Sequence, residues 1–339
     1  MSTAEGSTAF LEREDALVAL SAWVAAVADD GTGRLGFVCG EAGVGKTLLL
    51  RHFCEEQTSA TRFLWGSCDP LFTPRPLGPL LDIAQLAGGE LGELVQREAR
   101  PHEVTAALLR ELATRVPTIV VIEDVHWADE GTLDVLRLLG RRIRSTPTLV
   151  IASYRDDELN RSHPLRVVLG ELATSDAVAR LKLQPLSAAA VARLAEPFEV
   201  DADDLYRNTA GNPFFVSEVL ATGPGRIPPT VRDAVLARAS RLGPRARTVL
   251  DAAAVFPLYA EIWLLEALAG ETIDSLDECV GSGMLRPQAE GVAFRHELAR
   301  IAIEESLAPR QRLRLHEQAL AALVESSYGT PDAARVAHR

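Results

Sequence analysis

The sequence predicts an α/β protein with a doubly wound parallel sheet, followed by a largely helical region. Three observations lead to this prediction. Apolar runs of strand length alternate with helical stretches up to about residue 183. A glycine-rich segment joins the first of these strands to a helix. Beyond Pro185 the strand pattern gives way to helices. Alternating strands and helices are typical of a parallel sheet that is covered on both faces.

Length and composition bound what the chain can be. At roughly 150 residues per domain, its 339 residues correspond to two domains and a remainder. Hydrophobic residues make up 47% and charged residues 24%, which excludes a disordered chain. The formal net charge of −12 has the wrong sign for a protein that binds polyphosphate over its whole surface. A local phosphate site remains compatible with this charge.

Cysteine usage and hydropathy indicate a cytoplasmic protein. The four cysteines form no C-x-x-C pair and no apolar leader precedes residue 30, so we expect reduced thiols. The longest apolar stretch, residues 16–28, is too short to cross a bilayer, and we expect no contact with a membrane. Only Lys46 and Lys182 among the 35 basic residues are lysines, which makes each of them notable.

The first region is expected to contain five strands and the helices between them. Each strand is a short apolar run, and they are predicted at residues 35–39, 62–65, 118–122, 148–154 and 178–183. Helices are predicted where apolar residues repeat at helical spacing, at residues 10–28, from the glycine-rich segment to Phe53, and at 79–87, 102–115, 129–143 and 164–173.

The second region reads as helices with one small hairpin. The predicted helices span residues 187–195 with Ser187 as the cap, 202–210, 214–221, 230–242, 245–255, 261–269, 273–281, 297–307 and 310–325. A hairpin is expected at 284–294, turning at Glu290 and Gly291. This order suits an all-helical lid followed by a winged-helix domain.

The predicted domain boundaries follow from this pattern. We expect a nucleotide-binding domain at residues 1–185, a helical lid at 186–225, and a winged-helix-like domain at 226–325. The Gly- and Pro-rich stretch 223–229 is the expected linker between the last two. Residues 326–339 resemble the start of a further helical region, as in a truncated chain or in a naturally short relative.

A phosphate-binding loop is the clearest motif. The segment GEAGVGKT at residues 40–47 matches G-x-x-x-x-G-K-[ST], with an apolar strand before it and a helix after it. The glycines allow the backbone to turn tightly with its N–H groups pointing inward, and the helix N-terminus favours an anion. Lys46 is expected to reach the β- and γ-phosphates of a nucleotide, and Thr47 to offer its hydroxyl to Mg²⁺. The alternative is a glycine-rich turn with a solvated lysine.

Two carboxylates follow the apolar run 118–122. Glu123 and Asp124 at the end of a buried strand can hold Mg²⁺ through its waters and orient an attacking water. We assign Glu123 to the metal side and Asp124 to the water or the base. Asp129 is predicted to be the N-cap of the next helix rather than a ligand.

Arg155 directly follows the strand at 148–154. The carboxyl ends of parallel strands form the ligand crevice, so its guanidinium is placed to contact a γ-phosphate and to act as a third catalytic residue. The alternative is a surface arginine paired with Asp156 or Asp157.

Together these motifs resemble the nucleotide-binding domains of STAND-class P-loop ATPases of the AAA type, specifically the large ATP-binding, MalT-like regulators of the LuxR family. The resemblance covers roughly residues 8–325. Residues 10–14 (FLERE) are similar to the family's N-terminal motif, which implies that Arg13 lies near the adenine. Residues 122–129 (IEDVHWAD) resemble its extended Walker B segment, with Glu123 where an Asp is more usual. Ser153 to Arg155 match its sensor-1 arginine.

Two further segments carry the resemblance into the helical region. Residues 211–215 (GNPFF) match the family's G-x-P element, which implies that Pro213 packs on the base. Residues 294–298 (FRHEL) are similar to a histidine motif of related immune receptors, which implies that His296 reaches the β-phosphate of ADP. The resulting candidates for nucleotide contact are Arg13, Gly40, Gly43, Val44, Gly45, Lys46, Thr47, Leu48, Pro213 and His296, and those for the metal are Thr47, Glu123 and Asp124.

The resemblance implies an ATP- or ADP-binding switch in a transcriptional regulator, with slow Mg²⁺-dependent hydrolysis as the reset. Bound ADP is expected to hold the lid and winged helix, and ATP to favour an open, self-associating arrangement. An inducer or a regulatory protein is expected to act through C-terminal repeats, and DNA to bind only through a helix-turn-helix, both outside this chain. The stretch 226–316 carries twelve arginines and twelve acids, so its predicted winged helix lacks the basic excess of a DNA-binding module. The alternatives are a stand-alone P-loop ATPase, which includes a ring-forming motor, and a small-molecule kinase.

Overall fold

The structure is a computed structural model that describes residues 10–57, 61–71, 73–113, 116–160, 162–223 and 226–325. The chain divides into two compact units, Met1–Gln184 and Pro185–Arg339. Each unit is described below by itself. The predicted helical start at residues 326–339 lies outside the described residues, as do residues 224 and 225 of the predicted linker.

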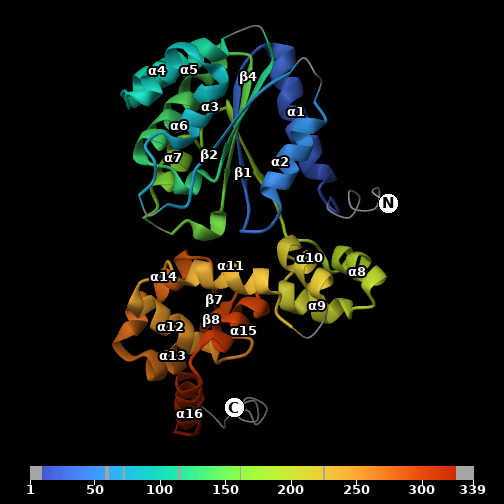
Figure 1. The fold of residues 1–339 in the computed structure, drawn as a ribbon, viewed down its shortest axis with the longest axis vertical. Coiled ribbons are helices and arrows are strands. Elements are labelled where there is room, and N and C mark those ends of the chain that lie inside the picture. Colours follow the sequence, from blue (N-terminus) through green and yellow to red (C-terminus); the bar gives the residue numbers. More distant parts are fainter. Residues whose placement is uncertain are drawn as a thin grey trace. The chain divides into compact units, whose positions relative to one another are not determined.

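The first unit contains a five-stranded parallel sheet. Its strands are β1 (Arg34–Cys39), β2 (Arg62–Ser67), β3 (Thr118–Glu123), β4 (Thr148–Tyr154) and β5 (Val178–Lys182). The strand order is β2-β3-β4-β1-β5, so β4 lies between β1 and β3 (Figure 1). In register, Cys39 pairs with Tyr154 and Ile122 pairs with Ala152. The carboxyl ends of β1, β4 and β3 are therefore neighbours at one edge of the sheet.

Helices cover both faces of this sheet, as Figure 1 shows. One face is covered by α1 (Glu14–Asp30) and α2 (Lys46–Glu55). The other is covered by α3 (Gly78–Ala87), α4 (Gly89–Gln96), α5 (Pro101–Leu112), α6 (Glu130–Arg142) and α7 (Pro164–Glu171). This confirms the predicted doubly wound α/β fold.

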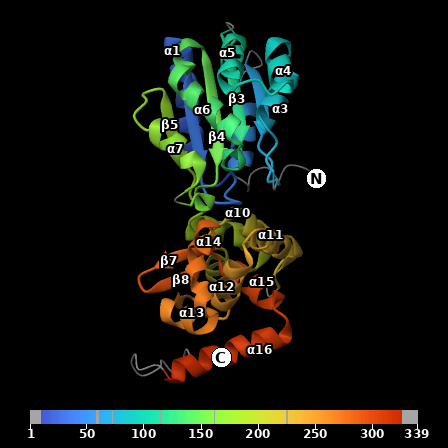
Figure 2. The same ribbon diagram turned by 90° about the vertical axis from the view of Figure 1, so that its left-hand side faces the viewer.

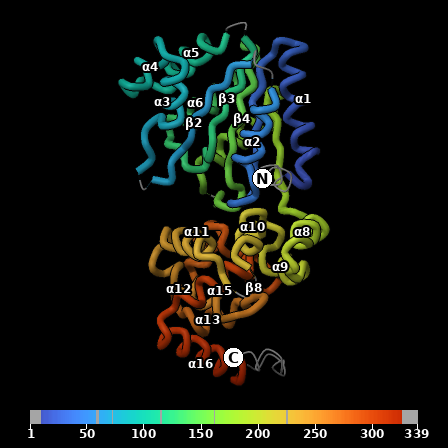
Figure 3. The backbone as a smooth tube through the Cα atoms, turned by 45° about the vertical axis from the view of Figure 1, so that its right-hand side comes forward, coloured from blue at the N-terminus to red at the C-terminus, as the bar shows by residue number. Residues whose placement is uncertain are grey.

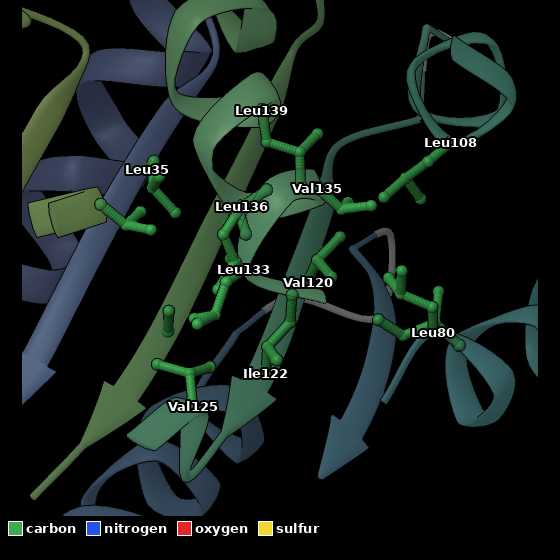
Figure 4. Packing of buried hydrophobic residues seen from close by; sticks show 14 of the residues in the cluster. Leu35, Leu80, Leu108, Val120, Ile122, Val125, Leu133, Val135, Leu136 and Leu139 are labelled. Atoms are coloured by element: carbon green, nitrogen blue, oxygen red, sulfur yellow. The ribbon is translucent and has the colours of Figure 1, made fainter. Parts of the chain in front are cut away.

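Alternate residues of β3 enter the two cores. Val120 and Ile122 pack with Leu133 and Leu136 of α6 in the cluster shown in Figure 4. Ile119 and its neighbours on the same face belong to the cluster under α1 and α2. Since side chains of a strand alternate between faces, a strand buried on both sides must be apolar throughout. This requirement explains the uninterrupted apolar run that predicted the strand.

The structure corrects three predictions for this unit. The first helix begins at Glu14 rather than at residue 10, because residues 10–12 form a turn and Glu12 has a φ of 57°. The helix α4 was not predicted, since Gly88 and Gly89 at its start read as a loop. The predicted helix at 102–115 ends at Leu112, and residues 114 and 115 lie outside the described residues.

The second unit consists of helices, labelled in Figures 2 and 3, and a three-stranded sheet. Its helices are α8 (Ala188–Ala195), α9 (Ala202–Thr209), α10 (Pro213–Thr222), α11 (Pro229–Ala239), α12 (Pro244–Ala254), α13 (Ile262–Ala269), α14 (Leu276–Gly281), α15 (Glu297–Ser306) and α16 (Pro309–Glu325). The predicted hairpin is confirmed as β7 (Leu285–Gln288) and β8 (Gly291–Phe294). A two-residue strand, β6 (Ala260–Glu261), adds to β8 and was not predicted. The predicted helix at 273–281 is a 3-10 helix as far as Ser275.

No helix in the described ranges is both long enough and apolar enough to span a bilayer. All four cysteines are free thiols. Burial raises the pKa of the Cys54 thiol to about 12 and that of Cys279 also to about 12, so neither is a reactive thiolate near neutral pH.

The core of the first unit gives a stability prediction. Leu136 of α6 is 0% exposed, whereas Leu86 of α3 is 62% exposed. We expect Leu136→Ala to lower the free energy of unfolding by about 2–5 kcal/mol, because it leaves a cavity in the core. The matched change Leu86→Ala should cost less than about 0.5 kcal/mol. Guanidinium unfolding in a Trp263→Phe background reports this unit alone, since the other three tryptophans belong to it. Equal effects of the two changes would contradict this packing.

Candidate nucleotide-binding site

The loop between β1 and α2 depends on glycine conformations. Gly43 and Gly45 have φ values of 81° and 96°, in the left-handed region that side chains with a Cβ rarely adopt. At Gly40 a Cβ would lie 2.9 Å from the carbonyl oxygen of Leu183, whose N–H donates to the Cys39 carbonyl at 2.8 Å. No side chain caps α2 at Gly45, so the first N–H groups of this helix remain available to a ligand. The loop therefore has the form required to bind phosphate.

Lys46 lies inside this loop. Its ammonium group donates to the carbonyl oxygens of Gly40 at 2.7 Å and Glu41 at 2.9 Å, and the residue is only 7% exposed. Burial lowers the pKa of Lys46, nearby Arg155 lowers it further, and Asp124 opposes the shift. The lysine thus lies inside the loop, and its ammonium group contacts backbone oxygens.

The N-terminal motif packs against the same loop. Arg13 is buried, and its guanidinium donates to the Val44 carbonyl oxygen at 3.0 Å. Phe10 stacks against His52 of α2, with ring centroids 4.0 Å apart. Arg13 and Val44, which are 31 positions apart in the sequence, are thereby joined at the phosphate loop. The loop's Val44 side chain is buried, whereas Leu48 in the first turn of α2 is exposed.

Glu123 connects the loop to the end of β3. The Thr47 hydroxyl donates to Glu123 Oε1 at 2.5 Å, and the Trp65 indole N–H donates to Oε2 at 2.9 Å. Trp65 lies on the neighbouring strand β2. The sequence analysis missed Trp65, because a single tryptophan in an apolar strand carries no signal of a polar role. These two bonds fix both carboxylate oxygens beside the hydroxyl that is predicted to bind Mg²⁺.

Asp124 occupies a strained backbone position at the end of β3. Its φ is 54°, in the left-handed region where Asp and Asn are enriched. Its N–H donates to the Ser153 hydroxyl at 3.1 Å, which fixes the residue against β4. Burial raises the pKa of the Asp124 carboxyl, and the attraction of Arg155 and Lys46 only partly offsets that shift.

Arg155, at the end of β4, has a different acidic partner from the two that the alternative prediction named. Its Nη1 donates to Glu158 at 2.7 Å, not to Asp156 or Asp157 as the alternative reading held. Its Nη2 lies 3.8 Å from Asp124, and its guanidinium carbon lies 4.4 Å from the centroid of the Trp127 ring. Glu158 was not predicted because its distance from the arginine depends on a 3-10 turn, Asp156–Glu158.

The neighbouring turn is fixed by two histidines and a cap. His126 is buried, with Nε2 3.5 Å from Glu158 and Nδ1 3.8 Å from Asp124. His163 Nδ1 accepts from the Leu165 N–H, so its Nε2 donates to the His126 carbonyl at 3.0 Å. Burial lowers the pKa of His163, in keeping with this neutral form. Asp129 caps α6 through the Gly131 N–H at 3.0 Å, which confirms its predicted role.

The remaining candidates, Pro213 and His296, lie in the second unit. Pro213 is the first residue of α10, which Asn212 caps by accepting from the Phe214 N–H. His296 Nδ1 lies 3.0 Å from the Thr209 carbonyl oxygen, and its ring meets that of Phe215 edge-on at 4.7 Å. The two segments that carried the family resemblance are thus in contact within this unit. Their predicted contact with a nucleotide stays a prediction.

The donor atoms of the first unit suit Mg²⁺ and a nucleotide. Mg²⁺ prefers hard oxygen ligands and keeps several of its waters. Glu123 and Asp124 at the end of β3 and Thr47 in the first turn of α2 offer such oxygens. Across the described ranges, no group of three or more His, Cys, Asp or Glu side chains is arranged as a metal cage. This combination fits an ion bound largely through water and phosphate oxygens.

Comparison with known proteins agrees with this geometry. Residues 9–151 match the AAA ATPase domain family. An uncharacterized protein of Rhizobium meliloti is 26% identical over 366 aligned residues, which cover 86% of this chain and 35% of that protein. The chain therefore spans about a third of the length of this curated relative.

Solved structures show the same fold at low identity. A Walker-type ATPase of Pyrococcus abyssi aligns with 86% of this chain and 95% of its own, at 17% identity and a TM-score of 0.58. The ORC1 protein of Aeropyrum pernix, solved in complex with DNA, aligns with 87% of this chain and 92% of its own, at 14% identity and a TM-score of 0.50. A STAND protein with a tetratricopeptide repeat sensor from Pyrococcus horikoshii covers 94% of this chain and 46% of its own, at 16% identity. Its TM-score of 0.42 is too low to support an argument.

The family match and the fold together show a P-loop ATPase domain in the first unit. The relation to LuxR-type regulators, the winged-helix assignment and the roles of the site residues remain predictions.

The phosphate loop gives the first prediction for the site. Lys46→Ala should abolish the rise in melting temperature produced by Mg·ATP, because a ligand stabilises the native state only by binding to it. At 100 times its Kd, that stabilisation is about 2.7 kcal/mol. The control is Lys182→Ala, which removes the other lysine of the chain, an exposed side chain paired with Asp156. Differential scanning fluorimetry measures both shifts. An unchanged shift in Lys46→Ala would remove this loop as the site.

Asp124 gives a prediction of pH dependence. Its folded-state pKa is raised, so the charged carboxylate is disfavoured in the fold and stability is lost as pH rises through that pKa. We therefore expect Asp124→Asn to raise the melting temperature of the ligand-free protein at pH 7. The difference should narrow as the pH falls below the raised pKa of Asp124, where the wild-type carboxyl is protonated. Melting curves from pH 4 to pH 7 measure it, and a difference that does not depend on pH would contradict the assigned burial cost.

Proposed function

We propose that this chain is an ATP/ADP switch module in which Mg²⁺-dependent hydrolysis of ATP is slow and serves as the reset. The observation that carries the proposal is the bond between Thr47 and Glu123, because it places the hydroxyl, the carboxylate and the Lys46 ammonium around one phosphate loop. This is the arrangement needed to bind a nucleotide phosphate together with a metal ion.

The phosphate loop supplies the binding that both nucleotides share. Lys46 would exchange its two backbone carbonyl partners for β- and γ-phosphate oxygens, and the N–H groups of Gly43, Gly45 and α2 would bind the remaining oxygens. Arg13 would support the loop through the Val44 carbonyl, with the adenine nearby as the family resemblance implies. Because ATP and ADP share the β-phosphate, the contacts with that phosphate set affinity without selecting a state.

Hydrolysis would depend on the carboxylates and on Arg155. Glu123, held by Thr47 and Trp65, would bind a water of the Mg²⁺ shell, and the ion would neutralise phosphate charge when bound. Asp124, with its raised pKa, would orient or deprotonate the attacking water. Arg155 would contact the γ-phosphate. Glutamate has a longer reach than the aspartate more usual at position 123, which supports a slow rate.

The second unit would report which nucleotide is bound. Pro213 would pack on the base and His296 would contact the β-phosphate of ADP, as the family resemblance implies. The contact of His296 with the Thr209 carbonyl and the Phe215 ring supports a coupling of residues 209–215 to the segment that follows β8. A change in the position of one segment would then alter the position of the other.

The wider role would be regulatory. The chain spans 35% of its curated relative, so further domains are compatible with a LuxR-type regulator whose inducer and DNA contacts lie outside this chain. ATP-dependent self-association would be the output of the switch. The alternatives are a stand-alone P-loop ATPase and a small-molecule kinase. The alignment with 95% of a Walker-type ATPase supports the first of these.

Identification of the nucleotide that purifies with the protein tests the proposal. Nucleotide released on denaturation would be separated by chromatography, and release of phosphate from Mg·ATP would be followed on the stripped protein. A switch should carry ADP and turn over ATP more slowly than about one per second, below the typical kcat range of enzymes. Rapid turnover without bound ADP would favour the stand-alone ATPase, and no binding of ATP or ADP would refute the nucleotide site.

His296 gives a prediction that separates the two nucleotides. His296→Ala should weaken binding of ADP more than binding of ATP, by about tenfold in the ratio of their Kd values, as expected for one lost charge-assisted hydrogen bond. His296→Asn, which can still donate to the Thr209 carbonyl, separates loss of the phosphate contact from loss of folding. His102→Ala on the exposed face of α5 is the control. Calorimetric titration measures each Kd, and equal losses for ATP and ADP would remove His296 from the switch.

A further inference from the structure

Glu158 and its surroundings hold Arg155 by three contacts within the protein. Nη1 of Arg155 donates to Glu158 Oε1 at 2.7 Å, and Nη2 lies 3.8 Å from Asp124 Oδ2. The guanidinium also covers the Trp127 ring, at 4.4 Å from its centroid. The Glu158 side chain is only 14% exposed, so its bond to Arg155 is weakly screened by solvent.

Glu158 is itself held in place. Its Oε2 lies 3.5 Å from Nε2 of the buried His126, whose backbone carbonyl accepts from His163 at 3.0 Å. The 3-10 turn Asp156–Glu158 fixes the spacing between the acid and Arg155. A carboxylate with one oxygen bonded to the arginine and the other close to a buried imidazole presents a defined acceptor rather than a mobile surface charge.

Lys46 offers a comparison inside the same site. Its ammonium group also rests on oxygens of the protein, those of Gly40 and Glu41, but these are neutral carbonyls. A phosphate replaces neutral acceptors favourably, because the ammonium group then pairs with a full negative charge instead of with carbonyl dipoles. For Arg155 the resident partner already carries a full charge, so a phosphate gains much less from displacing it.

We propose, on the basis of the function proposed above, that Glu158 is a positioning residue that competes with the γ-phosphate for Arg155 and thereby lowers the preference for ATP over ADP. ATP must break the bond between Arg155 and Glu158 before the arginine can reach its terminal phosphate. ADP has no γ-phosphate and leaves that bond intact. The strength of one intramolecular ion pair then sets how much ATP is needed to change state.

Binding measurements on five proteins test this proposal. Calorimetric titrations with Mg·ADP and with a non-hydrolysable Mg·ATP analogue would be carried out on wild type, Glu158→Gln, Asp156→Asn, Arg155→Met and the double variant Arg155→Met with Glu158→Gln. We expect Glu158→Gln to raise the ratio of Kd for ADP to Kd for the ATP analogue about tenfold, which corresponds to about 1.4 kcal/mol.

The controls separate this role from a merely structural one. Asp156→Asn removes one negative charge from the same turn, where its partner is Lys182, and should change the ratio less than about twofold. In the Arg155→Met background, Glu158→Gln should have no effect on the ratio, because the residue acts only through Arg155. A change that is equal for both nucleotides, or that persists without Arg155, would overturn the proposal. Failure of wild type to bind either nucleotide would instead refute the proposed function.

Tryptophan emission gives a second measurement that needs no change at Glu158. Because the guanidinium covers the Trp127 ring, its departure should alter the emission of that residue. The ATP analogue should therefore change the fluorescence of wild type relative to a Trp127→Phe variant, and ADP should not. Identical Trp127 signals with both nucleotides would show that Arg155 stays in place and would overturn the proposal.

Discussion

The hydrogen bond between the Thr47 hydroxyl and Glu123 is the interaction on which the site depends. It joins the first turn of α2 to the end of β3, although β4 lies between β1 and β3 in the sheet. The Trp65 indole holds the other oxygen of the same carboxylate from β2. Two strands and one helix thereby converge on one acid, so the distance between the phosphate loop and the carboxylates is set by the sheet register and not by a mobile side chain.

A second constraint is the cost of gathering charges where water is partly excluded. The positive charges of Lys46 and Arg155 repel each other, which lowers the pKa of Lys46. Burial disfavours the charged carboxylate of Asp124, and the attraction of these two cations only partly offsets that cost. Every one of these groups has a partner within the protein: carbonyls for Lys46, Glu158 for Arg155, and the Ser153 hydroxyl for the Asp124 backbone. A triphosphate with its metal ion would bring anionic oxygens for Lys46 and Arg155 and a cation for the carboxylate of Asp124. Lys46 and Arg155 are thus both paired with oxygens of the protein itself.

The fold of the first unit could be read from the sequence because its signals are local. The run 118–122 is buried on both faces of the sheet and must be apolar, and the glycines of residues 40–45 are required by backbone conformation. The contacts of Trp65 and Glu158 could not be read, since they depend on strand register and on a 3-10 turn. Helix α4 was missed because Gly88 and Gly89 at its start resemble a loop. Pro213 and His296 were singled out by family resemblance, and nothing in their local sequence would have done so.

The bond from the Leu183 N–H to the Cys39 carbonyl has a mechanical consequence. Leu183 lies one residue before the end of the first unit, and its carbonyl oxygen closely faces Gly40. The chain that leaves the first unit is therefore anchored beside Gly40, the first glycine of the predicted phosphate loop. A pull or a twist on that departing chain acts on the loop directly, without passing through the hydrophobic core.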